Sequence, residues 1–292
     1  INQVQEVTLE ANPDDMDDRF FDFLKTSKVN RLSIGIQSFD NSDLAYLNRV
    51  HDSNKATKSI ETAINCGINK ITADLLFGIP TSGIERLERD VNTLIQLGVN
   101  HISIYGLTVE PKTALEYLIR KEKTLAVDDD KYAEEMLWLM KSLPSLGYEQ
   151  YEISSFALPG FEAIHNSSYW HNIPYLGIGP SAHSYNNVVR SWNIENNMAY
   201  IRSLENGKAP SESETLDTIT HYNEWVMTKL RLREGIILSQ LLEEFGADIY
   251  DQFMAQAQPY ILSGDIISDK DSYILSLEGK LLADHITANL FL

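Results

Sequence analysis

The chain of 292 residues is 43% hydrophobic and 23% charged, so it can form one barrel-sized domain or one domain with an appendage. Its net charge of −18 argues against a nucleic-acid partner, because proteins that bind phosphates normally present a basic surface. No apolar run approaches the roughly 20 residues that cross a bilayer. The single cysteine, Cys66, excludes an intrachain disulfide and favours a cytoplasmic location.

The first 110 residues alternate strand-like with helix-like segments. The clearest helical stripe runs over residues 84–95, where apolar side chains recur at a spacing of about 3.6 residues. Strands that alternate with helices predict a parallel sheet with right-handed crossovers. The four strand-like segments cover residues 4–10, 31–37, 71–77 and 102–108.

Each of these strand-like segments is predicted to end in a polar or charged residue that is followed at once by a turn. These residues are Glu10, Gln37, Asp74 and Thr108. Parallel β/α proteins build ligand sites at the carboxyl ends of their strands, so the four side chains predict one wall of a binding pocket. Arg49, after the second strand, could pair with a ligand carboxylate or be an ordinary surface arginine. Glu10 could instead cap a turn, and Asp74 could form a structural salt bridge.

The alternating pattern loosens beyond residue 110. Strands are predicted over residues 151–156 and 175–183, and the stretch 205–213 has the Gly, Pro and Ser content of a linker. This organisation predicts two domains, residues 1–204 and 205–292. The second domain has three helical patterns and two short strands, which is typical of a winged-helix-like fold. Its residues 239–292 hold two lysines against nine acidic residues, which argues against DNA recognition.

The least ordinary stretch is His165-Asn166-Ser167-Ser168-Tyr169-Trp170. A histidine followed at short spacing by two aromatic residues could hold a flat macrocycle. The imidazole would lie at the centre of the ring system and the aromatic side chains would stack on its face. Taken alone, the same residues could also form an aromatic core cluster.

Five segments carry short motifs whose combination is specific. They are Asn30 to Phe39 (NRLSIGIQSF), Asn48 to His51 (NRVH), Asp74 to Pro80 (DLLFGIP), Tyr105 to Pro111 and Tyr175 to Ser184. Together they resemble the oxygen-independent coproporphyrinogen III oxidase family of radical S-adenosylmethionine (SAM) proteins. The resemblance covers nearly all of the chain and implies an α/β fold: an incomplete (β/α)6 TIM-like barrel with a C-terminal helical domain. It also implies that Glu10, Gln37, Arg49, Asp74 and Thr108 contact SAM.

Within that family, the pattern H-N-x-x-Y-W at residues 165–170 resembles the signature of the heme-chaperone branch. The resemblance implies that His165, Asn166, Tyr169 and Trp170 contact heme or porphyrin. It further implies that the protein delivers heme to heme-dependent membrane enzymes. Two alternatives remain open. One is oxidative decarboxylation of coproporphyrinogen III to protoporphyrinogen IX. The other is an ordinary β/α metabolic enzyme that uses the strand-end pocket without a cluster.

The family also carries a C-x-x-x-C-x-x-C loop, whose thiolates hold a [4Fe–4S] cluster at which SAM is reduced to an adenosyl radical. This chain has no such motif. We therefore expect it to hold no cluster, to bind no cofactor by itself and to perform no radical chemistry. Its first residues fall inside the family pattern, so we expect the chain to begin within a longer protein. The strand at residues 4–10 would then be an unpaired edge, which predicts self-association.

Overall fold

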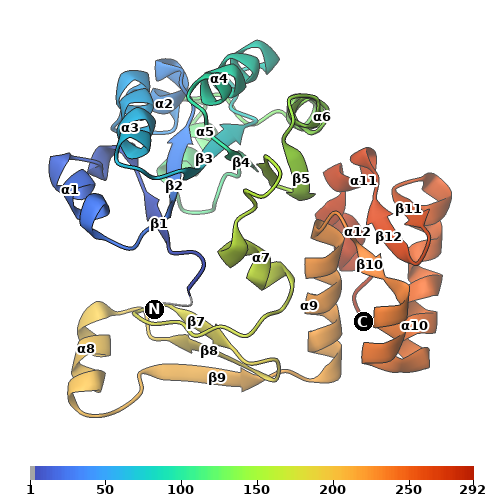
Figure 1. The fold of residues 1–292 in the computed structure, drawn as a ribbon. Helices are drawn as coiled ribbons and strands as arrows, with labels where there is room; N and C mark the ends of the chain where they lie inside the picture. Colours follow the sequence, from blue (N-terminus) through green and yellow to red (C-terminus); the bar gives the residue numbers. More distant parts are fainter. Residues whose placement is uncertain (1–3) are drawn as a thin grey trace. The chain divides into compact units, whose positions relative to one another are not determined.

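The computed structural model describes residues 4–292, which divide into two compact units, Ile1–Ile164 and His165–Leu292 (Figure 1). The sequence predicted a boundary between residues 204 and 205. The units divide earlier because β9 (Ser211–Thr215) pairs with β8 (Val189–Asn193), so one sheet spans the predicted boundary. No helix in the described part of the chain is long and apolar enough to cross a membrane.

Unit 1 is built on a six-stranded sheet with the order β1-β2-β3-β4-β6-β5. The first four strands are parallel, as the alternating pattern predicted, and the last two are antiparallel. The strands are β1 (Thr8–Ala11), β2 (Arg31–Gln37), β3 (Lys70–Phe77), β4 (His101–Gly106), β5 (Glu149–Glu152) and β6 (Ser155–Ala157). This arrangement agrees with an open, TIM-like α/β barrel.

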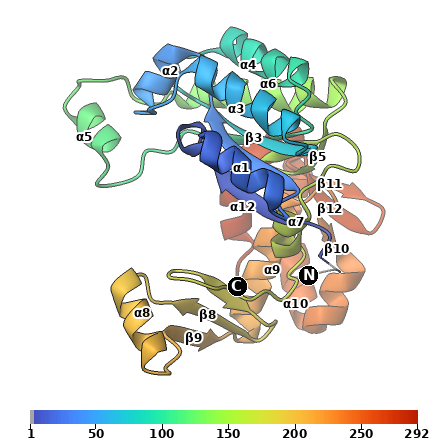
Figure 2. The same cartoon turned by 60° about the vertical axis from the view of Figure 1, so that its left-hand side comes forward.

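Helices connect the parallel strands, and α1, α3 and α4 cover the same face of the sheet (Figures 1 and 2). Sequential strands joined by right-handed crossovers require this one-sided cover. On α4, the predicted stripe contributes Leu87, Val91 and Leu94 to the core. The helical elements are η1 (Pro13–Asp15), α1 (Asp18–Thr26), α2 (Asn41–Tyr46), α3 (Ser53–Asn65), α4 (Ile84–Gln96), α5 (Ala114–Arg120) and α6 (Asp129–Ser145).

Unit 2 contains two small antiparallel sheets with the orders β7-β8-β9 and β10-β12-β11. The strand predicted at residues 175–183 is wrong. That segment makes one isolated bridge from Tyr175 to Tyr185, because Gly179 and Ser181 adopt positive φ angles of 108° and 60°. Two of the predicted helices join as α10, with a kink at Gly246. The strands are β7 (His183–Tyr185), β8, β9, β10 (Ile236–Ile237), β11 (Ile266–Asp269) and β12 (Ser272–Leu275).

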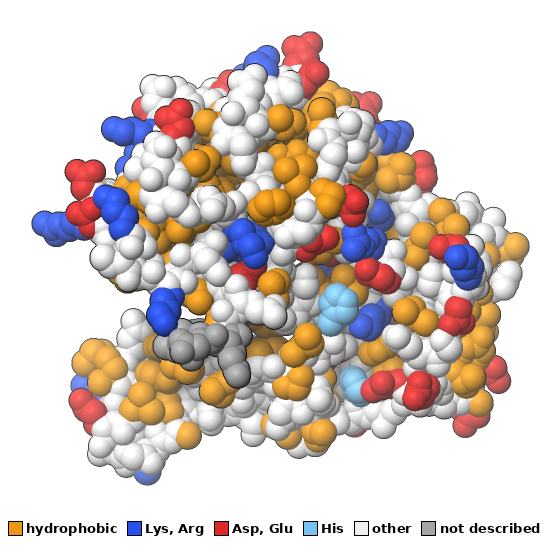
Figure 3. All heavy atoms as spheres, in the orientation of Figure 1, with side chains coloured by type: hydrophobic (Ala, Val, Ile, Leu, Met, Phe, Trp, Pro, Cys, Tyr) orange, Lys and Arg blue, Asp and Glu red, His pale blue; other side chains and the backbone are white. Residues whose placement is uncertain are grey.

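The helices of unit 2 begin with α7, which carries the H-N-x-x-Y-W pattern. They are α7 (Ile164–Trp170), α8 (Asn197–Glu205), α9 (Thr218–Arg231), α10 (Leu238–Ser263), α11 (Leu277–Leu281) and α12 (Ala283–Asn289). On the face shown in Figure 3, acidic, basic and apolar side chains are intermingled. The excess of acidic residues is therefore spread out on this face.

Strand β1 lies at an edge of the sheet and pairs with β2 on one side. Because an exposed edge presents unpaired N–H and C=O groups, we expect the chain to self-associate reversibly through β1. A lysine in place of Thr8 should weaken this association about tenfold, since charged side chains on an edge oppose strand pairing. Sedimentation over a concentration series measures the effect. The matched control is Thr26→Lys, at an exposed position of α1. A wild-type chain that is monomeric at all concentrations contradicts the prediction.

Candidate functional site

The middle of the parallel sheet brings polar side chains from four strands together. Register places Glu10 of β1 beside Ser33 of β2, and Asp74 of β3 beside Ser103 of β4. The carboxylate of Asp74 accepts hydrogen bonds from both serine hydroxyl groups. Glu10 and Asp74 were both predicted to end their strands; Glu10 lies next to the end of β1, but Asp74 lies inside β3, which continues to Phe77. The sequence analysis missed Ser33, which lies between the two carboxylates, and Ser103, which bonds Asp74 from the other side.

Asp74 is the most perturbed group in this cluster. Its pKa is raised from 3.8 to about 7, first by burial and then by the negative charge of Glu10, while the hydrogen bonds from Ser103 and Ser33 act in the opposite direction. Tyr105, next along β4, also has a raised pKa, first because of burial and then because Asp74 is near. An aspartate that titrates near neutrality can accept or donate a hydrogen bond, and such groups are enriched at functional sites.

A second group of polar side chains surrounds Gly35 of β2. A Cβ atom at Gly35 would lie 2.9 Å from Nε2 of Gln37 and 3.1 Å from Oδ1 of Asn12, so no other residue fits without displacing them. Arg49 donates from Nη1 to the same Asn12 oxygen at 3.2 Å. Gln37 has a φ angle of 69°, after a register shift in β2. The side chain of the predicted residue Gln37 therefore lies beside Gly35 together with Asn12, a residue that the sequence analysis missed and that accepts the hydrogen bond from Arg49.

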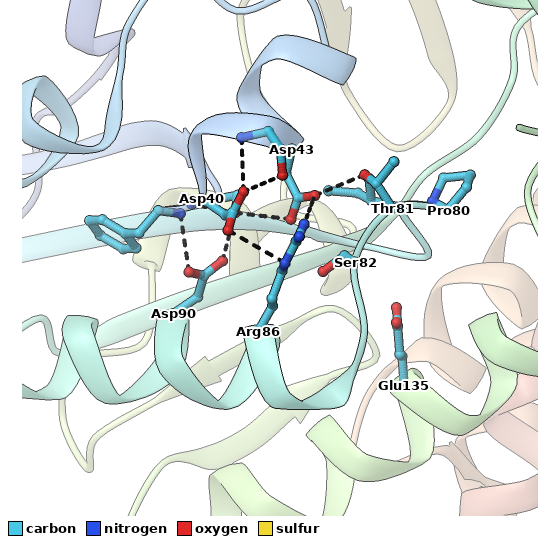
Figure 4. Close-up of polar contacts among 12 residues, drawn as sticks. Asp40, Asp43, Pro80, Thr81, Ser82, Arg86, Asp90 and Glu135 are labelled. Carbon is cyan, nitrogen blue, oxygen red and sulfur yellow. Dashed lines mark hydrogen bonds and ion pairs between the residues drawn. The ribbon is translucent and has the colours of Figure 1, made fainter. Parts of the chain in front are cut away.

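The backbone after Gln37 is fixed by a buried carboxylate network (Figure 4). Asp90 of α4 accepts a hydrogen bond from the Ser38 hydroxyl at 2.9 Å and another from the Phe39 amide at 3.1 Å. Nearby, the Asp43 carboxylate accepts a hydrogen bond from Nη1 of Arg86, with an N–O distance of 2.6 Å. Burial raises the pKa of Asp90 to about 6, against the effect of its two hydrogen bonds. This network holds the unusual conformation at the end of β2 in place.

Thr108 differs from the other predicted residues, because β4 ends two residues earlier at Gly106. The Thr108 hydroxyl makes a long local bond of 3.5 Å to the Gly106 carbonyl. Gly106 packs so closely on Tyr132 of α6 that a Cβ atom there would overlap its ring. This close packing ends the strand, and Ser103 and Tyr105 are the β4 residues that reach Asp74.

The residues present do not fit an iron–sulfur cluster. Cys66 is the one cysteine of the chain and forms the C-cap of α3, whereas the family motif requires three thiolates. Across residues 4–292, no group of three or more His, Cys, Asp or Glu side chains could hold a metal ion. Glu10 and Asp74 could accept hydrogen bonds from an amine, and Arg49 could pair with a carboxylate.

In unit 2, the predicted heme-contacting residues form the start of an aromatic row. The His165 ring meets Tyr169 edge to face at 5.0 Å, and its Nε2 lies 3.0 Å from the tyrosine hydroxyl. Tyr169 in turn meets Tyr175 at 4.7 Å. Trp170 has the guanidinium of Arg231 over its ring at 5.1 Å. Asn166 is exposed on the same helix. The short α7 therefore presents a partly exposed aromatic surface, not a closed core.

Comparisons with known proteins found relatives that match almost the whole chain. Residues 1–94 match the family model described as "Radical SAM superfamily". The chain is 32% identical to the heme chaperone HemW of Bacillus subtilis, over 98% of this chain and 76% of that protein. It is 34% identical to HemW of Mycobacterium tuberculosis (strain H37Rv), over 98% of this chain and 71% of that protein.

The fold has a solved counterpart in the coproporphyrinogen III oxidase HemN of Escherichia coli. That structure has a TM-score of 0.79 and covers 98% of this chain and 69% of the oxidase. Its identity is 17%, so it supports the architecture and not the reaction. With the HemW relatives more than 30% identical over most of their length, the chain belongs to the HemW family of heme chaperones, within the radical SAM superfamily.

Proposed function

We propose that this protein binds heme through unit 2 and delivers it to heme-dependent enzymes, including enzymes of the membrane. The observation that carries the proposal is the exposed row from His165 through Tyr169 to Tyr175, in a chain that belongs to the HemW family. Flat aromatic faces and an imidazole are the groups that recognise an iron macrocycle. In this proposal His165, Asn166, Tyr169 and Trp170 contact the heme. The single cysteine supports a reducing, cytoplasmic setting.

Unit 1 is proposed to supply one wall of a SAM site, which would be filled only together with a cluster that this chain does not hold. Glu10 and Asp74 would accept hydrogen bonds from the ligand amine, and Arg49 would pair with its carboxylate. Gln37 and Thr108 complete the proposed set. Bound SAM supplies an adenosyl group and a methyl sulfonium to the radical SAM superfamily, whose chemistry also needs a [4Fe–4S] cluster. The one cysteine of this chain cannot by itself hold such a cluster, and the HemW relatives favour the heme function over coproporphyrinogen oxidation.

Hemin titration of the chain tests the proposed heme function. We expect a saturable Soret band, and we expect His165→Ala to weaken hemin binding about tenfold, because it removes the ring that holds Tyr169 in the row. His285→Ala, on α12, is the matched control and should bind as the wild type does. If the wild-type chain gives no saturable binding, or if His165→Ala binds hemin unchanged, the proposal is wrong.

A further inference from the structure

Beside α7, unit 2 has a large cavity that the H-N-x-x-Y-W pattern does not account for. Its volume is about 760 Å³, and it lies among the segment after α7, α9 and the start of α10. Protein cavities that bind small molecules or cofactors commonly measure about 300–1,000 Å³. A smaller hollow of about 190 Å³, lined by Tyr169 and Trp170, shares Asn172 and Tyr185 with it. The cavity therefore adjoins the proposed heme-contacting residues.

The lining of this cavity combines three kinds of group. Trp225 and Tyr185 are buried aromatic residues that form flat walls. Lys229 supplies a positive charge, and burial lowers its pKa. His171 and His221 supply imidazoles. Glu243 and Glu244 face the same space, and Gln240 and Asn187 add neutral polar groups. Histidine, basic and acidic side chains are seen close together on the unit 2 part of Figure 3.

The two histidines of the cavity are not equivalent. Nδ1 of His171 lies 2.7 Å from the carbonyl oxygen of Ser167, one turn earlier on α7. A carbonyl can only accept, so Nδ1 carries the proton, and the lone pair of a neutral ring is on Nε2. Iron-ligating histidines are oriented in this way by a second hydrogen bond. His221 instead has its Nε2 directed at the Glu244 carboxylate, 3.9 Å away.

The chemistry of the cavity suits an iron macrocycle better than a bare ion. Among the described residues, no three potential ligands are grouped as an isolated metal ion would require. Iron in a porphyrin already has four ring nitrogen ligands and needs one or two axial ligands from the protein. The porphyrin ring needs flat apolar walls, and its propionates need a cation. Trp225 provides a flat wall, Lys229 provides the cation and His171 provides an axial ligand.

We infer that this cavity is the seat of the heme ring, that His171 is an axial ligand of its iron, and that Lys229 binds a propionate. The inference rests on the proposed heme function and assigns that function a place and a ligand. His165 then acts beside this seat through its contact with Tyr169. The seat is open on one side, with His171 exposed, which suits a protein that must release what it binds.

The test compares hemin with metal-free protoporphyrin IX, bound to the full 292-residue chain. His171→Ala should remove the absorption and resonance Raman signature of histidine-ligated iron and weaken hemin binding at least about tenfold. The same variant should leave protoporphyrin IX binding unchanged, because that ring has no iron. Lys229→Met, which keeps the side-chain stem, should weaken both ligands. His221→Ala is the matched control within the cavity and should keep the ligation signature.

Three outcomes overturn the inference while heme binding stands. In the first, His171→Ala weakens hemin and protoporphyrin IX equally, so His171 is only structural. In the second, His221→Ala or His165→Ala removes the ligation signature and His171→Ala does not. In the third, Lys229→Met binds both ligands as the wild type does. If the wild-type chain binds neither ligand, the proposed heme function fails, and the inference fails with it.

Discussion

Replacing Arg31 with alanine should destabilise unit 1 by about 3–5 kcal/mol, the usual cost of leaving one partner of a buried ion pair without the other. Arg31 is fully buried at the start of β2. Its Nε donates to Glu6 at 2.9 Å, and the two side chains are 1% and 3% exposed. Its Nη2 also donates to the carbonyls of Phe161 and Glu162, at 2.8 and 3.0 Å. One side chain therefore connects β2 with the segment before β1 and with the end of the unit.

A second variant separates the effect of the broken ion pair from the effect of the lost side-chain volume. A double variant, Arg31→Met with Glu6→Leu, removes both charges and keeps the packing, so it should be less destabilised than Arg31→Ala. The stability of both variants is measured by urea unfolding, monitored by far-UV circular dichroism, and by amide exchange in β2 and β3. Arg19→Ala, at an exposed position of α1, is the control. A double variant that is as unstable as Arg31→Ala contradicts the ion-pair explanation.

The sequence predicts the parallel half of unit 1 well, because its strands are apolar and its helices have a regular stripe. Strand β2 has the predicted bounds at both ends. Strand β1 starts at Thr8, later than predicted, since the Val7 amide bonds to the Asn30 side chain and not to a neighbouring strand. Local patterns do not record such long-range contacts. For the same reason, the position of Arg31 gave no sign of its partners Glu6, Thr72, Phe161 and Glu162.

The candidate site is predictable only in part. Glu10 and Asp74 stand out because a carboxylate in or after an apolar strand is costly unless it has a use. Asn12 and Asp90 do not stand out, because an asparagine before proline is typical of a turn and an aspartate on a helix is typical of a solvated face. Their roles depend on register and on the path of the chain after Gln37. The cavity of unit 2 is likewise formed by segments far apart in sequence.

Replacing Asp74 with asparagine should stabilise unit 1 at pH 8, although it removes a carboxylate from the proposed SAM site. The pKa of Asp74 is about 7 in the folded chain and 3.8 when exposed. Ionising it in the folded state therefore costs up to about 4 kcal/mol, at roughly 1.4 kcal/mol for each pH unit of the shift. Asparagine carries no charge and can still hydrogen-bond with Ser33 and Ser103, so the variant avoids this cost.

The effect has a defined pH dependence. Between pH 3.8 and about 7 the folded chain binds a proton at Asp74 that the unfolded chain has lost, so the unfolding free energy of the wild type falls as the pH rises through this window. The Asp74→Asn variant lacks this slope, and its advantage should be largest above pH 7 and should vanish near pH 4. Asp22→Asn, at an exposed position on α1, is the control. Urea unfolding from pH 4 to 8 measures the effect. If the variant is less stable than the wild type at pH 8, the Asp74 carboxylate stabilises the fold. It would then not be a group kept for a ligand at a cost in stability.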